Sequence, residues 1–196
     1  MFCWGWAIDR CAKPSDPPRH YKTKEDEQGP DEVKWQEDMA VVTKSHYDAF
    51  TSYLPCLEKD QRSFLDRNAI KFTMDTAPAF SNMSVTFDFY SAKHFDRDHT
   101  WAAGVWYSQH KLSHAQQKKG AIPLTSGGHF VVPTCGVAFD LSAPCTLLVW
   151  NGSRHLHATA ILETYNSLRI GTSMQVTSKH FKHETGQKYY FLPKME

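Results

Sequence analysis

The chain has 196 residues, of which 41% are hydrophobic and 13% aromatic, so it can bury a substantial core as a single domain. The net charge of +1 gives no bulk attraction to a polyanion, although a local basic patch is compatible with it. No uninterrupted apolar run approaches the roughly 20 residues that span a bilayer, and the first residues lack a basic segment followed by a long apolar one. We therefore expect neither a membrane protein nor a secreted one.

The cysteines are odd in number and form no CxxC pair. They are Cys3, Cys11, Cys56, Cys135 and Cys145. This pattern is typical of reduced thiols in a cytosolic or nuclear compartment. We expect neither a disulfide framework nor structural zinc.

The first 32 residues are expected to form an N-terminal extension and linker. Four apolar residues near the start alternate with period two: Phe2, Trp4, Trp6 and Ile8. The alternation predicts a short strand added to the main domain. Residues 13–32 are rich in proline and mixed charge with hardly an apolar residue, which predicts an exposed arm. The remaining domain is then expected over residues 33–196.

A helical region follows this arm. From Asp31 onward, apolar residues recur at spacings of three, four and eight, which predicts an amphipathic helix up to Pro55. These apolar residues are Trp35, Met39, Val42, Phe50 and Leu54. Residues 57–70 are expected to continue the helical region after the proline.

Short strands dominate the chain after Thr76. Eight segments are rich in β-branched and aromatic residues and are separated by Gly, Pro, Ser and Asn: 81–95, 101–109, 127–133, 136–141, 145–152, 156–162, 169–178 and 188–193. Many short strands at this spacing predict a sandwich or a barrel. The fold class is therefore mainly β with N-terminal helices.

One histidine–aspartate pair lies at the end of a predicted strand. His94 and Asp96 are two residues apart, so in extended backbone their side chains project from the same face. His46 and Asp48 have the same spacing but lie within the predicted helix, where side chains two apart diverge. Only the first pair can readily bind one ion.

A third ligand would complete a ferrous site. Iron centres that activate oxygen use two histidines and one carboxylate on one face, leaving the other positions open. His155 and His157 lie later in the chain, also two apart, and one of them would suffice. The residues alone leave open which of the two it is.

The segment from Gly127 to Ile161, "GGHFVVPTCGVAFDLSAPCTLLVWNGSRHLHATAI", resembles the C-terminal part of the 2-oxoglutarate- and Fe(II)-dependent dioxygenases. The resemblance implies a double-stranded β-helix, also called a jelly-roll or cupin-like fold. It implies that His94, Asp96 and His157 ligate Fe(II) and catalyse, with His155 a neighbour of the distal ligand. Arg169, 12 positions after His157, would pair with the distal carboxylate of 2-oxoglutarate.

Residues 80–106 followed by 127–133 most resemble the TET/JBP group of this superfamily, especially its fungal members, which oxidise methylated bases in nucleic acid. The resemblance implies Fe(II), 2-oxoglutarate and O₂, with methylated DNA as substrate and partner and a nuclear location. 5-Methylcytosine is the first choice of base and N6-methyladenine the second. Three features depart from the family pattern: Cys145 stands where Gly is usual, no acidic residue follows it, and residues 169–173 lack the frequent Arg-x-Ser form.

Weaker assignments accompany these. Asp98 and His99 are candidates to contact the polar edge of the substrate, and His110 is a candidate to contact the cosubstrate. The basic segments 108–120 and 178–190 are candidates to contact phosphates. Two alternatives stay open: the same chemistry on a protein side chain or small molecule, and a cupin-like module that binds without turnover. No obligate protein partner is expected.

Overall fold

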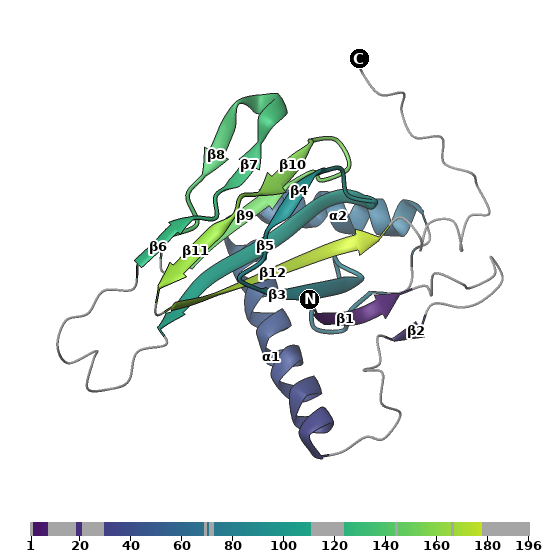
Figure 1. Ribbon diagram of the computed structural model, residues 1–196. Helices are drawn as coiled ribbons and strands as arrows, with labels where there is room; N and C mark the ends of the chain where they lie inside the picture. The colour runs from purple at the N-terminus through teal and green to yellow at the C-terminus, as the bar shows by residue number, and fades with distance from the viewer. Residues whose placement is uncertain are drawn as a thin grey trace.

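The computed structural model describes residues 2–7, 19–20, 30–68, 70, 73–110, 124–143, 145–165 and 167–177 (Figure 1). The predicted basic segments lie mostly, and the predicted strand 188–193 wholly, outside these residues. Within this described part, no helix is both long enough and apolar enough to cross a membrane. The division at residue 33 stays a prediction, since the first helix begins at Pro30.

Two helices precede most of the strands. Helix α1 spans Pro30–Tyr53 and helix α2 spans Pro55–Arg67, in agreement with the predicted helical region. Pro55 lies in the first turn of α2, where its missing N–H costs no helical hydrogen bond. The two helices are therefore separate elements that meet at Leu54.

The larger sheet has six antiparallel strands. In spatial order they are β2 (Arg19–His20), β1 (Phe2–Ala7), β3 (Asn82–Phe87), β12 (Ser167–Thr177), β5 (Asp98–His110) and β9 (Cys145–Trp150). The N-terminal strand predicted from period-two alternation is β1, and it pairs with β3.

The smaller sheets complete the β domain. Four strands pair in the order β4 (Ser91–His94), β10 (His157–Thr159), β7 (Phe130–Val132) and β8 (Val137–Phe139), with a 3-10 turn at Pro133–Cys135 between the last two. Strands β6 (Leu124–Gly127) and β11 (Leu162–Tyr165) form a separate pair. Side chains from the six-stranded and four-stranded sheets line one cavity, as expected for a double-stranded β-helix. The expected fold class is confirmed.

Strand β12 divides the core from the cavity. Met174 and Val176 are buried on its helix side, where Met174 packs in a cluster that contains Phe50 of α1. Ser173 and Gln175 alternate with them and line the cavity. The period of two that makes a strand two-sided thus gives β12 one apolar and one polar face.

A bulge shapes the start of β5. Ala103 pairs with Met174 and His99 with Val176, so three residues of β5 face one residue of β12. The buried side-chain amide of Gln61, from α2, binds the backbone at this bulge. Its Nε2 donates to the carbonyl of Trp101 at 3.0 Å. Its Oε1 accepts from the backbone N of Trp101 at 3.2 Å and from the hydroxyl of Thr100. The helices thus support the strand that begins beside the site described next.

Candidate metal centre

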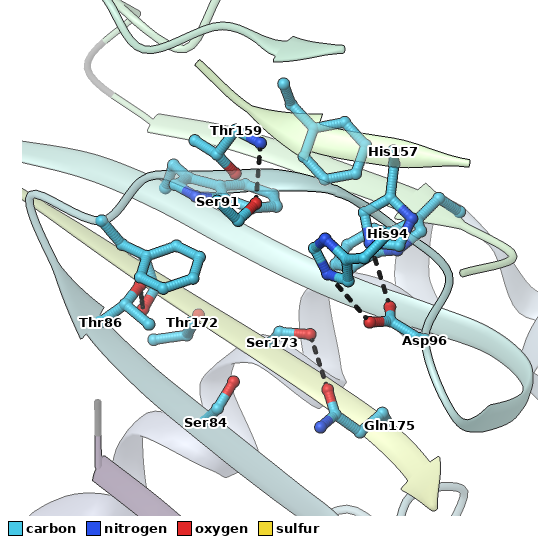
Figure 2. A pocket seen from close by; sticks show the side chains of 15 residues that line it. Ser84, Thr86, Ser91, His94, Asp96, His157, Thr159, Thr172, Ser173 and Gln175 are labelled. Carbon is cyan, nitrogen blue, oxygen red and sulfur yellow. Dashed lines mark hydrogen bonds and ion pairs between the residues drawn. The ribbon is translucent and has the colours of Figure 1, made fainter. Parts of the chain in front are cut away.

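Two paired strands bring the first histidine and the distal histidine together. His94 ends β4 and His157 begins β10, and the two residues are partners in the antiparallel register, with ring centroids 4.5 Å apart. The carboxylate of Asp96 contacts both rings: its Oδ1 is 3.4 Å from His94 Nε2 and its Oδ2 is 3.2 Å from His157 Nε2 (Figure 2). One ligand atom from each residue lies within 4.8 Å of the others.

Backbone carbonyls orient both imidazoles. His94 Nδ1 is 2.7 Å from the carbonyl oxygen of Ala92, and His157 Nδ1 is 2.9 Å from that of His155. A carbonyl can only accept, so each Nδ1 carries a proton and each Nε2 is the nitrogen that faces Asp96. Histidines that ligate metals are commonly fixed in this way. Both Nε2 atoms are therefore directed at Asp96, and each can bind a cation when it carries no proton.

A glycine makes room for the aspartate. The backbone N of Asp96 donates to the carbonyl of Gly152 at 2.9 Å, and a Cβ added at Gly152 would lie 2.1 Å from Asp96 Oδ2. The turn that carries this glycine is closed by Asn151, whose Oδ1 accepts from Ser153 Oγ at 2.9 Å and whose carbonyl accepts from the N of His155 at 2.9 Å. The same turn therefore positions Asp96 and leads the chain into His157.

The charges of the three groups are coupled. Burial acts to raise the pKa of Asp96, but the hydrogen bond and charge of His157, helped by His94 and Trp150, outweigh it and the pKa is lowered. Burial acts to lower the pKa of His157, but Asp96 and the carbonyl at His155 raise it overall. A divalent cation would take the place of this shared positive charge.

A cavity of about 340 Å³ opens beside the triad. One part of its wall is aromatic: Phe89, Trp106, Phe130 and Trp150. The part that faces the triad from the larger sheet is polar and uncharged: Ser84, Thr86, Ser173 and Gln175 (Figure 2). Ser173 Oγ donates to Gln175 Oε1 at 2.9 Å, which leaves the amide NH₂ of Gln175 as a donor.

Arg169 is buried but does not line this cavity. Its side chain is held by two backbone carbonyls, with Nη1 donating to Gly128 at 2.6 Å and Nη2 to Phe89 at 3.0 Å. Burial lowers its pKa, and the charge of Asp88 opposes this shift, yet a guanidinium stays charged at neutral pH. The carboxylate of Asp88 also accepts a hydrogen bond from the backbone N of Arg169 at 2.8 Å, through its Oδ1. This cation is 3% exposed, and both hydrogen bonds that its guanidinium makes in the described part of the chain go to neutral carbonyls.

The other predicted site residues are less well placed. His155 contributes its carbonyl, and its imidazole is not part of the group that surrounds Asp96. Asp98 does not line the cavity; burial and then the charge of Asp96 raise its pKa to about 8, against the opposing charge of His157. The side chains of His99 and His110 lie outside the described residues, so their predicted contacts stay predictions.

The second histidine–aspartate pair diverges, as the helical spacing predicts. His46 Nδ1 donates to Thr172 Oγ1 at 3.2 Å, on the sheet side of α1. Asp48 instead forms an exposed ion pair with Lys44 at 2.8 Å. The two side chains of this pair share no partner in these contacts.

Three residues of the site have no clear signal in the sequence. Trp106 and Trp150 are expected in the core, and both are at most 9% exposed, but they also line the cavity. Gly152 looks like an ordinary turn residue after a strand, and only the approach of Asp96 shows why a side chain would not fit.

Comparisons with known proteins agree with this geometry. Residues 1–160 match the family model of the Tet-like 2OG-Fe(II) oxygenase superfamily. The fold is similar to that of NgTET1 in complex with 5mC DNA, with 12% identity over 93% of this chain and a TM-score of 0.60; this chain covers 61% of the NgTET1 chain. The viral collagen prolyl hydroxylase of Paramecium Bursaria Chlorella virus-1 matches with 14% identity over 61% of this chain and 67% of its own, at a TM-score of 0.31, which is too low to bear on the fold. A search among curated proteins gave no match.

Proposed function

Because this chain belongs to the Tet-like 2OG-Fe(II) oxygenase superfamily, we propose that it is a dioxygenase that oxidises the methyl group of methylated bases in DNA. 5-Methylcytosine is the preferred base and N6-methyladenine the second choice. The observation that carries the proposal is the triad of His94, Asp96 and His157, with both Nε2 atoms directed at one carboxylate.

The described residues fit a ferrous ion. Two neutral imidazoles and one carboxylate form the donor set of non-haem Fe(II) oxygenases, which leaves coordination positions open for other ligands. His94, Asp96 and His157 would hold the ion, and the carbonyls at Ala92 and His155 would keep the two rings oriented. When bound, Fe(II) with 2-oxoglutarate and O₂ would supply the oxidising chemistry.

The buried Arg169 fits the cosubstrate. Its guanidinium is buried and uses two of its five N–H groups on neutral carbonyls, and a planar guanidinium can donate two parallel hydrogen bonds to a carboxylate. The distal carboxylate of 2-oxoglutarate would accept hydrogen bonds from the remaining N–H groups. We assign Arg169 this role.

The cavity suits a neutral, flat and polar substrate. Its wall opposite the triad offers hydroxyl and amide groups without a charged side chain, and Phe130 stacks on His157 at 5.4 Å with an interplanar angle of 21°. A methylated base in a duplex would have to be flipped out of the stack to reach this cavity, at a cost of a few kcal/mol. Aromatic walls and uncharged polar groups are what a flipped base would contact. The similarity of fold to NgTET1, which is described with 5mC DNA, also supports this choice of substrate.

The proposal is tested by turnover on defined oligonucleotides. The protein is incubated with Fe(II), 2-oxoglutarate and duplexes that carry 5-methylcytosine, N6-methyladenine or no methyl group. Succinate is quantified, and the nucleosides are analysed by mass spectrometry. We expect succinate and oxidised 5-methylcytosine with the unaltered chain, and neither with Asp96→Ala.

Each outcome bears on a different part of the proposal. Succinate without any change in either methylated base would mean that the dioxygenase acts on another substrate, such as a protein side chain or small molecule. No succinate with any substrate, from protein that binds Fe(II), would favour a binding module without turnover.

A further inference from the structure

The chain at the end of β9 lies against the carboxylate of Asp96. The backbone N of Asp96 donates to the carbonyl of Gly152, and a Cβ added at Gly152 would collide with the Asp96 side chain. Two residues earlier, Trp150 is the last residue of β9 and lines the same cavity as Asp96. One short segment therefore brings both a backbone acceptor and an indole ring to the aspartate.

Aromatic neighbours fix the orientation of this indole. Three rings pack around it, with centroid distances of 5.1 Å to Phe130, 5.8 Å to Trp106 and 6.1 Å to His157. Trp150 itself is 9% exposed. A large side chain packed on several sides at the density of a protein interior has little freedom to change its torsions. The direction of the indole N–H is therefore set by the packing around the ring.

The indole N–H of Trp150 is a buried donor. Its Nε1 is inaccessible to solvent and makes no hydrogen bond of normal distance and angle within the described residues. The N–H nevertheless acts on Asp96. Burial acts to raise the pKa of this carboxyl, and the two histidines of the triad, helped by the N–H of Trp150, lower it overall. A buried donor without a full hydrogen bond costs free energy, so native structures rarely keep one without a reason.

Both oxygens of Asp96 contact the histidines in this structure. Oδ1 lies 3.4 Å from His94 Nε2, and Oδ2 lies 3.2 Å from His157 Nε2 (Figure 2). An ion bound to both Nε2 atoms would replace these contacts, because each of these nitrogens serves one partner at a time. A carboxylate that binds an ion through one oxygen keeps the other oxygen as an acceptor, and ligating carboxylates are in turn hydrogen-bonded. Metal binding would therefore free an acceptor beside a donor that lacks one.

We propose that the indole N–H of Trp150 donates to the oxygen of Asp96 that does not bind the ion, and so positions this carboxylate as a metal ligand. The inference rests on the proposed function, because it requires that the triad binds a divalent cation. Trp150 is a positioning residue: it acts through Asp96 and takes no part in the oxidation. This role requires an indole at the end of β9, since a purely apolar ring would fill the same wall without a donor.

The first test removes the N–H and keeps an aromatic ring. Trp150→Phe should lower the affinity for Mn(II) about 10–100-fold, because the loss of a group that supports a metal ligand has an effect of this size. Trp101→Phe is the matched control: it makes the same change in β5, at a position that does not line the cavity, and should leave the affinity unchanged. Calorimetric titration of the folded proteins with Mn(II) measures both effects without turnover.

The second test observes the hydrogen bond in the unaltered chain, so it does not depend on whether a variant folds. The indole proton of Trp150 is assigned by NMR spectroscopy through its contacts with the neighbouring rings of Phe130 and His157. The protein is then titrated with Zn(II), which is diamagnetic. Formation of the hydrogen bond should move this proton to lower field, by more than the indole proton of Trp101 moves.

The outcomes separate this inference from the proposed function. A loss of affinity in Trp150→Phe alone, together with the shifted proton, supports the role of the indole. An unshifted proton in Zn(II)-saturated protein, or unchanged affinity in folded Trp150→Phe, would overturn it. Equal losses in Trp150→Phe and Trp101→Phe would also overturn it, because the N–H beside Asp96 would not be the cause. If the unaltered chain binds neither Mn(II) nor Zn(II), the metal centre and the proposed function fail together.

Discussion

His46 and Asp48 have the same spacing as His94 and Asp96, but the two pairs lie in regions of opposite character. Helix α1 directs His46 to the sheet and leaves Asp48 with Lys44 at the surface. His94 ends β4 and Asp96 follows two residues later, and the side chains of both lie beside His157. The difference teaches that a spacing acquires chemistry only through the backbone conformation that carries it.

The strongest test of this contrast removes each aspartate in turn. Asp96→Ala should lower the affinity for Fe(II) or Mn(II) by at least about 100-fold, because even the loss of a group that supports a metal ligand costs 10–100-fold. Asp48→Ala should leave metal affinity unchanged, since its partner is Lys44. Metal titration of the two folded variants measures both effects, and similar losses in the two would contradict the contrast.

A smaller effect is expected from crowding the aspartate without removing it. Gly152→Ala places a Cβ 2.1 Å from Asp96 Oδ2, so the carboxylate must shift, and metal affinity should fall about 10–100-fold. Gly136→Ala is the matched control, because no atom lies within 4 Å of its added Cβ, although its positive φ of 65° makes a side chain costly there. Loss of metal affinity in both glycine variants would mean that the approach to Asp96 is not the cause.

Substitutions in the two helices should change the free energy of unfolding and leave metal affinity unchanged. Gln61→Met leaves the backbone N–H and carbonyl of Trp101 without their partner, so the free energy of unfolding should fall by about 1–3 kcal/mol. Ser45→Ala on the exposed face of α1 should change it by less than about 0.5 kcal/mol. Chemical denaturation measures both, and metal affinity of the folded Gln61 variant should match that of the unaltered chain.

The smallest effect concerns the pH dependence of stability. Burial lowers the pKa of His46 below its ordinary value of 6.5, so below that pH the unfolded chain binds a proton that the folded chain resists. The free energy of unfolding is therefore unaffected by His46 above about pH 6.5, and it decreases as the pH falls from there toward the pKa of His46 in the folded chain. His46→Gln should therefore show a shallower decline in the free energy of unfolding over this window, measured by denaturation at several pH values.

Much of the site could be predicted from local patterns. The strand that ends at His94 was predicted from the β-branched and aromatic residues before it, and the spacing of two predicted that Asp96 would lie near His94, although Asp96 itself lies beyond the end of β4. The helix around His46 was equally visible from its apolar spacing. Arg169 lies on a strand with period-two alternation, so its face could also be predicted, although its buried partners could not.

The remainder depends on contacts between distant segments. Gly152 matters because Asp96, 56 positions earlier, approaches it, and no local pattern encodes that approach. Asp98 follows the ligand pair in sequence, but the β5 strand that it begins does not direct it into the cavity wall.

Strand β4 has four residues, and within the described part of the chain it pairs only with β10, at His94 and Ser91. An ion shared by His94 and His157 would act as a cross-strand staple at the end of this short edge. Because ligands that bind only the folded state stabilise it, adding metal should slow amide hydrogen exchange most in residues 91–94. The strand that supplies the ligand His94 would then itself be stabilised by the bound ion.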